Sequence, residues 1–569
     1  MEKTNKIFRT EIAETIFNNK YKHEHAETWD ELAVTLVNDV CQSFISQEEK
    51  DELIKMISEM EFIPGGRYIY YAGRPNKYFN NCYLLKSEED SREDWSNLSW
   101  KAQSCLMTGG GIGNDYSIYR AEGEPIKKTG GVASGPLSAM NMINEIGRNV
   151  MQGGSRRSAI YASLNWRHGD INKFLKVKDW HNTVVAGTGG KTIADLKEAD
   201  FNYPAPLDMT NISLNYDNKF LEEVLENPYE SWKTKDKEPK MTGKIPDTFY
   251  ENVLQALRTG EPGMSFNFFD QENETLRNAC TEVTSSDDSD VCNLGSVNMS
   301  RIDSIERFER VVELGTKFLL CGTLRAHLPY DKVRKTREKN RRLGLGLMGV
   351  HEWLLKKNYR YEVTPELHDW LKVYRDVSTV TGTDLANKLD ISVPVAFRAI
   401  APTGTIGMLA STTTGIEPLF AVAYKRRYLK GSSKWHYQYV VDGTAKVLIE
   451  TYGLDPSKIE SAVDLEKDYE RRIKFQADVQ DYVDMAISST LNLSNWGSEY
   501  NNEAMAMDFA KTLAKYAHRL RGFTCYPSGS RGGQPLTSVP YEVAISHKGV
   551  EFTEHDICDI SGHGGSCGI

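Results

Sequence analysis

The chain has 569 residues, of which 40% are hydrophobic and 26% are charged, and its formal net charge is −10. This length is too great for one small core and suits a large barrel with appended helices. The acidic balance argues against nucleic-acid binding, because any phosphate site must then rely on backbone amides and a few placed cations. No run of eighteen apolar residues predicts a membrane span, and no secretory signal opens the sequence. We therefore expect a cytoplasmic protein whose nine cysteines are reduced thiols.

The first predicted elements are helices. Apolar residues recur at helical spacing through residues 29–44 and 49–60, and a Pro-Gly-Gly-Arg turn follows at residues 64–67. These patterns predict an N-terminal helical region over residues 1–75.

The long middle part of the chain, residues 76–540, alternates short apolar runs with amphipathic helical patterns. Residues 138–152 and 307–328 are predicted helices, and residues 341–350 form an apolar run that contains glycines. Alternation of this kind favours an α/β sheet or barrel. The glycine-rich residues 541–569 predict a flexible C-terminal tail.

The most informative residues are Asn278, Cys280 and Glu282, which occupy alternate positions. In an extended segment their side chains point the same way, so an amide, a thiol and a carboxylate converge on one small volume. Cys292 adds a second thiol a short loop later. These residue types suit catalysis, although a surface loop with two ordinary cysteines has the same pattern.

Three further segments carry candidate sites. The glycine run Gly109–Gly113 lacks the full spacing of a dinucleotide-binding motif. It is instead typical of a site where two backbones approach closely, since glycine has no side chain. The second segment consists of Pro402, Thr403, Gly404 and Thr405, directly before a predicted helix. Free backbone N–H groups at the start of such a helix can bind a phosphate, although an ordinary threonine-capped helix has the same sequence pattern. In the tail, the spacing of zinc ligands is found at His555, Cys558, His563 and Cys567.

The pattern Asn-x-Cys-x-Glu, followed by Cys-Asn-Leu-Gly-Ser, resembles the active-site loop of ribonucleotide reductases. The resemblance extends from Lys20 to Val550. It implies a ten-stranded α/β barrel with a central finger loop, together with the N-terminal helical region and the flexible tail. No regulatory lobe precedes the helical region in this sequence, so we expect no overall on/off control by ATP and dATP.

The resemblance also implies catalytic roles. Cys280 is similar to the residue that carries a transient thiyl radical, which takes a hydrogen atom from C3′ of the ribose. Glu282 is then the general base on the 3′-hydroxyl, and Asn278 holds the ribose hydroxyls in register. Cys82 and Cys292 correspond to the reducing thiol pair. We expect a loop inside a barrel to shield this chemistry from solvent.

Other roles follow from the same resemblance. The segment Pro402–Thr405 resembles the loop that binds the substrate phosphates, and Asp90 and Ser91 match the position of residues that bind the effector nucleotide. Cys558 and Cys567 resemble the mobile thiol pair that reduces the active-site disulfide again. The implied partners are a ribonucleotide substrate, a deoxynucleotide or ATP effector, and thioredoxin or glutaredoxin as reductant. The chain is expected to be a monomer or homodimer, and no metal site is assigned.

The radical source is predicted from one late segment. Aerobic two-component reductases use adjacent tyrosines on a late barrel strand, whereas residues 522–527 contain the single tyrosine Tyr526. The sequence of this segment and that of residues 144–166 resemble the adenosylcobalamin-dependent class of ribonucleotide reductases. The tail lacks the Arg-Gly-Tyr motif of the glycyl-radical class. Adenosylcobalamin is therefore the expected cofactor, with diphosphate substrates favoured over triphosphates.

Two alternatives stay open at this point. The chain could be the large catalytic subunit of a two-component, metal-dependent reductase, which is active only with a second protein. It could also be a nucleotide-binding regulatory protein with a zinc-binding tail and no turnover.

Overall fold

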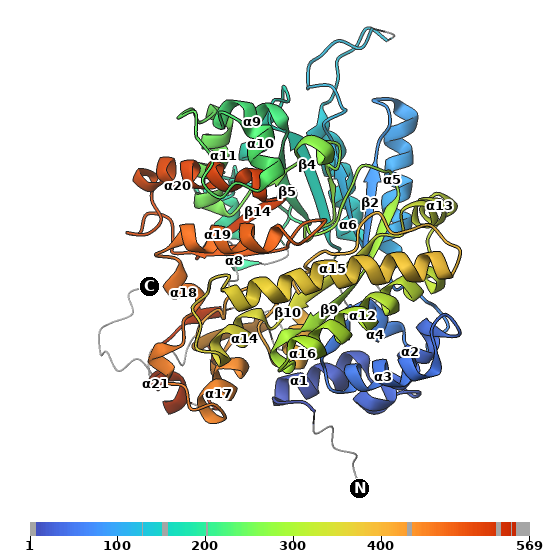
Figure 1. Cartoon of the computed structure of the whole chain (residues 1–569). Coiled ribbons are helices and arrows are strands. Elements are labelled where there is room, and N and C mark those ends of the chain that lie inside the picture. Colours follow the sequence, from blue (N-terminus) through green and yellow to red (C-terminus); the bar gives the residue numbers. More distant parts are fainter. Residues whose placement is uncertain are drawn as a thin grey trace.

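The fold is described from a computed structural model (Figure 1). The described residues are 7–127, 129–150, 158–200, 203–429, 435–530, 536–547 and 549–553. Within them, the main sheet contains ten strands. None of the described helices combines the length and the apolar character that a bilayer crossing requires.

The first half of the main sheet consists of five strands that follow one another in the chain and pair in parallel. They are β2 (Cys82–Lys86), β3 (Gly111–Asp115), β4 (Ile160–Asn165), β5 (Thr210–Tyr216) and β6 (Gly263–Phe266). Crossover helices connect them, as parallel strands require. The longest of these helices are α5 (Arg92–Met107), α6 (Pro136–Asn149) and α11 (Asp247–Thr259).

The second half is again built from parallel strands. It contains β9 (Asp290–Asn298), β10 (Leu343–Met348), β13 (Thr490–Leu493) and β14 (Gly522–Pro527). β10 pairs with β9, and β13 pairs with β14. Residues 398–400 fill the gap between these pairs, since Arg398 bridges Leu345 of β10 and Ile400 bridges Ile487 just ahead of β13.

The two halves meet at two antiparallel seams. At the first seam β2 pairs with β9, and at the second β6 pairs with β14. With these two seams and the bridging residues 398–400 between β10 and β13, the sheet has no free edge and closes into a barrel. The ring comprises the nine strands named above with residues 398–400 in the tenth position, so the predicted ten-stranded α/β barrel is confirmed. Figure 1 shows β2, β4 and β5 in the upper part of the view and β9 and β10 in the lower part.

Helices also cover the second half. They are α12 (Ile305–Arg325), α13 (Asp331–Asn340), α14 (Val350–Lys356), α15 (Pro365–Lys388), α16 (Gly404–Ala410), α17 (Gly443–Glu450), α19 (Tyr469–Gln480) and α20 (Glu503–Tyr516). The long helix α15 runs across the front of the molecule in Figure 1. It packs on α12, and both helices contribute buried side chains to one core with β9 and β10.

The N-terminal region is helical, as its pattern predicts. It contains α1 (Glu11–Ile16), α2 (Trp29–Cys41), α3 (Gln47–Ser58), β1 (Phe62–Pro64) and α4 (Gly66–Tyr71). Capping boxes start α2 at Thr28 and α3 at Ser46, where side chains satisfy the first free N–H groups. β1 pairs with β9, and Trp29 and Phe62 lie in the same core as α12. The N-terminal helices thus share their core with the second barrel half.

A short hairpin lies between β6 and β9 in the chain. Its strands are β7 (Leu276–Arg277) and β8 (Thr284–Ser285). The amide N–H of Ala486, beside the second barrel half, donates to the carbonyl of Glu282 at 2.8 Å. From the first half, the side-chain amide of Asn211 on β5 donates to the carbonyl of Ala279 at 2.9 Å. Because opposite walls of the barrel hold it, the hairpin occupies the interior and is the predicted finger loop.

A separate four-stranded antiparallel sheet lies beside the barrel. Its strands are β11 (Ala423–Leu429), β12 (Trp435–Val441), β15 (Leu536–Ser538) and β16 (Glu551–Thr553). The tail predicted to begin at residue 541 therefore starts with ordered structure, since Tyr541–Ser546 forms helix α21 and β16 pairs with β12. The remainder of that tail lies outside the described residues.

Candidate active site

The tip of the finger is a tight turn. The carbonyl of Asn278 accepts from the N–H of Thr281 at 2.9 Å, and its side-chain oxygen accepts from the N–H of Val283 at 2.9 Å. Thr281 has a φ of 70°, in the left-handed region that is uncommon for non-glycine residues. The expectation of an extended segment is therefore wrong. The three polar side chains come from one turn instead of one face of a strand.

The two thiols predicted to form a redox pair face each other across the first seam. In the register of β2 and β9, Cys82 lies directly opposite Cys292. Opposed residues of antiparallel strands have Cβ atoms about 4.5–5.5 Å apart, close to the 3.5–4.5 Å that a disulfide needs. Both thiols are buried, and burial together with the nearby Glu282 raises their pKa values well above the ordinary range. They are neighbouring thiols that burial keeps neutral, which suits the predicted reducing pair.

Asn278 connects the finger to this pair. Its side-chain N–H donates to Sγ of Cys82 at 3.0 Å, and the residue is fully buried. Cys280, two residues on, is the one exposed thiol among the described cysteines. Charge on Cys280 nevertheless contributes to the raised pKa of Cys82, after burial and Glu282. The expectation that Cys280 is buried is wrong, because it lies in the turn at the finger tip, where Thr281 is also only half-buried.

Glu282 is a buried carboxyl group. It is 1% exposed, and its Oε2 atom has no hydrogen-bond partner among the described residues. Burial raises its pKa to about 7, and the amide of Asn278 and a backbone hydrogen bond oppose that rise. A carboxyl group with this pKa exchanges its proton near neutral pH, as a general base must.

The glycine run makes room for the finger. A Cβ atom on Gly113 of β3 would lie 1.7 Å from the carbonyl oxygen of Arg277, and one on Gly111 would be 3.6 Å from the Cβ of Ala279. Only glycine lets β3 approach the hairpin backbone this closely. The sequence-based interpretation of the run as a close backbone approach is confirmed.

Sequence reasoning missed the residues that hold the base of the finger. Arg277 is fully buried, and its Nη2 donates to Oδ1 of Asn267 at 2.6 Å and to the carbonyl of Arg521 at 3.1 Å. Its Nη1 donates to the carbonyl of Glu274 at 3.1 Å. The only signal in the sequence was a charged residue directly before Asn278, which does not reveal partners 244 positions away.

The predicted phosphate loop starts a helix. Thr403 has a φ of 51° and directly precedes α16. Its hydroxyl accepts from the N–H of Gly415 at 2.8 Å, so within the described chain it does not cap the first N–H groups of α16. Gly404 is exposed, with no atom within 4 Å of a Cβ built there. Pro402 and Thr405 are half-buried beside it. This geometry leaves the helix start open to an anion.

The predicted effector residues lie in the loop between β2 and α5. Oδ2 of Asp90 accepts from the backbone N–H of Arg120 at 3.0 Å and from its Nε at 2.6 Å. The hydroxyl of Ser91 accepts from the N–H of Asp94 and caps α5. Both residues thus shape this loop, and effector binding there stays a prediction.

The four tail residues singled out as a thiol shuttle or zinc site, with Cys558 and Cys567 among them, lie outside the described residues. Within the part of the chain that is described, no cluster of His, Cys, Asp and Glu side chains is arranged to hold a metal ion.

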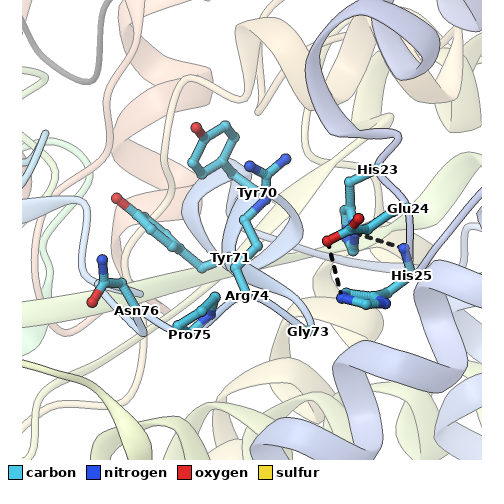
Figure 2. A pocket seen from close by; sticks show the side chains of 9 residues that line it. All are labelled: His23, Glu24, His25, Tyr70, Tyr71, Gly73, Arg74, Pro75 and Asn76. Carbon is cyan, nitrogen blue, oxygen red and sulfur yellow. Dashed lines mark hydrogen bonds and ion pairs between the residues drawn. The ribbon is translucent and has the colours of Figure 1, made fainter.

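A hollow of about 570 Å³ lies on the N-terminal region, between the start of α2 and the end of α4 (Figure 2). Its polar groups contact one another, since His25 donates its N–H to Nδ1 of His23 at 3.3 Å and its ring lies 3.3 Å from the Glu24 carboxylate. None of the predicted site residues lines it, so it is separate from the finger.

The family described as "Ribonucleotide reductase, barrel domain" matches residues 80–370 and 395–526, from just before β2 into β14. The chain belongs to this family. The match covers the barrel from β2 to residue 526 of β14, together with the whole finger.

Individual ribonucleotide reductases match over most of the chain. A vitamin B12-dependent ribonucleoside-diphosphate reductase of Mycobacterium tuberculosis is 23% identical over 559 residues, covering 89% of this chain and 76% of that protein. Its namesake from Thermoplasma acidophilum is 26% identical over 536 residues, covering 85% and 66%. A protein of Mycobacterium phage D29, provisionally named an adenosylcobalamin-dependent ribonucleoside-triphosphate reductase, is 27% identical over 524 residues, covering 76% and 68%.

Proposed function

We propose that the chain reduces ribonucleotides to 2′-deoxyribonucleotides through a thiyl radical on Cys280, with Cys82 and Cys292 as the electron donors. One observation carries this proposal. The register of β2 and β9 sets the two buried thiols opposite each other, and the finger that bears Cys280 is hydrogen-bonded to one of them through Asn278. A radical thiol, a base and a two-electron reductant thus meet in one site.

The steps balance with these groups. The Cys280 radical takes the hydrogen atom from C3′, and Glu282 takes the 3′-hydroxyl proton. The 2′-hydroxyl leaves as water after it receives a proton from the thiol pair. Cys82 and Cys292 supply two electrons in total, the second hydrogen goes to C2′, and a disulfide forms. Cys280 then returns its hydrogen atom to C3′ and Glu282 returns its proton, so only the redox pair ends oxidised.

We propose adenosylcobalamin as the radical source. When bound, it supplies a carbon-centred radical by homolysis of its cobalt–carbon bond. The chain's own thiols fit this source, because Cys280 is exposed at the finger tip while Cys82 and Cys292 are buried. A generator outside the finger can therefore reach one thiol and leave the reducing pair untouched. The names of the related proteins support the same cofactor.

The loop Pro402–Thr405 is proposed to hold the substrate phosphates at the open start of α16, and Asp90 and Ser91 to contribute to an effector site. The two diphosphate reductases and the phage protein differ in the substrate that their names give. Diphosphates are proposed as the substrates, and thioredoxin or glutaredoxin as the reductant.

The decisive experiment is a turnover assay of the purified chain with and without adenosylcobalamin, using both diphosphate and triphosphate substrates. Cys280→Ser should lower turnover to below about 0.1% of wild type, because a hydroxyl holds its hydrogen too tightly to form the radical. Nucleotide affinity should stay within about twofold, since that substitution removes no phosphate contact.

The matched control is Cys525→Ser. This thiol on β14 is buried and donates to the carbonyl of Ala256 at 3.4 Å, a bond that a serine hydroxyl also makes. The Cys525→Ser variant should therefore keep wild-type turnover. Undiminished turnover in Cys280→Ser would end the radical mechanism. Turnover that needs a second protein, and not the cobalamin, would favour the two-component reductase instead.

A further inference from the structure

We propose that Arg342 is a positioning residue that ties the finger to the strand of Cys292 by bridging the carboxylates of Glu274 and Asp290. This inference rests on the proposed function. Glu274 stands at the base of the finger, two residues before β7, and Asp290 opens β9, two residues before Cys292. Arg342 directly precedes β10, so the parallel register of β10 and β9 sets it beside Cys292.

The contacts of Arg342 run to both carboxylates. Its Nε donates to Oδ2 of Asp290 at 2.7 Å, and its Nη2 lies 3.7 Å from Oε1 of Glu274. Arg342 is 5% exposed and Asp290 is fully buried. A planar guanidinium can face two carboxylates from fixed directions, which a lysine ammonium on its flexible stem cannot do equally well.

The same two carboxylates hold the returning strand of the finger. Oε2 of Glu274 accepts from the hydroxyl of Thr284 at 2.8 Å, and Oδ2 of Asp290 accepts from the hydroxyl of Ser285 at 2.6 Å. Thr284 and Ser285 are consecutive residues of β8. The contacts therefore close a ring in which Arg342 is the only cation shared by both carboxylates among the described residues. Moving Arg342 loosens the finger and the redox strand together.

The charges agree with this assignment. Burial by itself raises the pKa of Glu274, but Arg521 and Arg342 outweigh it and lower that pKa to about 2. Arg521 donates to Oε2 of Glu274 at 2.9 Å, so the two carboxylates, Glu274 and Asp290, are balanced by two arginines, Arg342 and Arg521. At Cys292, burial, Asp290 and Glu282 raise the thiol pKa, whereas Arg342 opposes the rise. Arg342 thus lowers the pKa both of Glu274, at the base of the finger, and of Cys292, on β9.

The test compares Arg342→Lys and Glu274→Gln with Arg519→Lys. Arg519 is also a buried arginine that bridges two carboxylates, Asp478 and Asp481, but it lies in the turn after α20 and its ion pairs run to the end of α19 and not to the finger. The two finger variants should lower kcat at least about tenfold with KM within about twofold, because misplaced reacting groups slow chemistry and the phosphate loop is untouched. Arg519→Lys should keep kcat while losing a similar amount of thermal stability.

The double variant of Arg342 and Glu274 supplies a second readout. Because both residues act through one ring, its loss of kcat should be smaller than the product of the two single losses. Combining Arg342→Lys with Arg519→Lys should instead multiply the effects. Folded finger variants with wild-type kcat would overturn this inference, as would an equal loss of kcat in Arg519→Lys. No turnover in the wild-type chain would count against the proposed function itself. If Arg342→Lys fails to fold, the less buried Glu274→Gln decides.

Discussion

At the scale of single residues, burial gives Glu282, Cys82 and Cys292 the protonation states that the proposed chemistry needs. In the proposed mechanism Cys82 and Cys292 must keep their hydrogens until they reduce the substrate, and burial raises both thiol pKa values. The base must give and take a proton near neutral pH, and burial raises the pKa of Glu282 to about 7. Asn278 moderates both groups, since its amide contacts Cys82 and lowers the pKa of each.

The raised pKa of Glu282 predicts a pH-dependent stability. The ordinary value is 4.5 and the folded value is about 7, so between these values the folded chain keeps a proton that the unfolded chain has lost. Its contribution to stability is therefore present below pH 4.5, falls as the pH rises, and is lost above about pH 7. Glu282→Gln stays neutral and escapes this loss. Relative to wild type, its free energy of unfolding should improve by up to about 3 kcal/mol from pH 5 to pH 8.

Urea unfolding of both proteins at pH 5, 6.5 and 8 measures this change. The difference between the two free energies should grow steadily across the three values. A constant difference would mean that Glu282 ionises at its ordinary pKa, and that it cannot act as a base poised at neutral pH.

At the scale of elements, the finger depends on one glycine in a neighbouring strand. Gly113→Ala places a methyl group 1.7 Å from the carbonyl oxygen of Arg277, so β3 and the hairpin must separate. We expect stability to fall by about 1–3 kcal/mol from overpacking. Because the finger tip moves with its base, kcat/KM should fall at least about 100-fold.

The control for this substitution is Gly131→Ala. A Cβ atom there meets only the Thr129 hydroxyl, at 3.9 Å, and the residue has no positive φ. Steady-state kinetics and thermal unfolding of both variants separate the two sites. Full activity in Gly113→Ala would show that the hairpin can shift without disturbing the thiols.

The finger also shows how far the sequence alone leads. Asn278, Cys280, Glu282 and Cys292 lie within fifteen residues, so their pattern could be recognised, and the alternation of strand and helix predicted the barrel class. The turn at the tip could not be predicted, because Thr281 adopts a positive φ that tertiary contacts impose. Partners such as Arg342 were missed for the same reason, since contacts between distant segments leave no local periodicity to detect.

At the scale of the whole molecule, the order of the strands explains why the finger crosses the barrel. β6 lies at the second seam and β9 at the first, on opposite sides of the closed sheet. The chain that joins them, residues 267–289, passes through the interior. The same closure buries the proposed redox pair, since Cys82 is 6% exposed and Cys292 is fully buried.

Because these two sulfurs are buried, their disulfide should be difficult for an external protein to reduce between turnovers. A dithiol on the surface of thioredoxin cannot contact sulfurs enclosed by the barrel, because exchange requires direct attack on a disulfide sulfur. We propose that a tethered thiol pair carries the electrons inward, and Cys558 and Cys567 are the two cysteines of this sequence beyond residue 553. Replacing both by serine should lower thioredoxin-driven turnover at least about tenfold, while turnover driven by dithiothreitol stays within about twofold because a small dithiol can enter.

Both rates are measured on the full chain, with Cys525→Ser as the control for the loss of a cysteine elsewhere. A single turnover started from the reduced protein should yield one deoxynucleotide per active site in every case, because the pair at the seam is intact. If the tail cysteines hold zinc instead, the substitutions release the metal and leave thioredoxin-driven turnover unchanged. Electrons would then have to reach the seam by a route through the barrel wall, which the burial of Cys82 and Cys292 opposes.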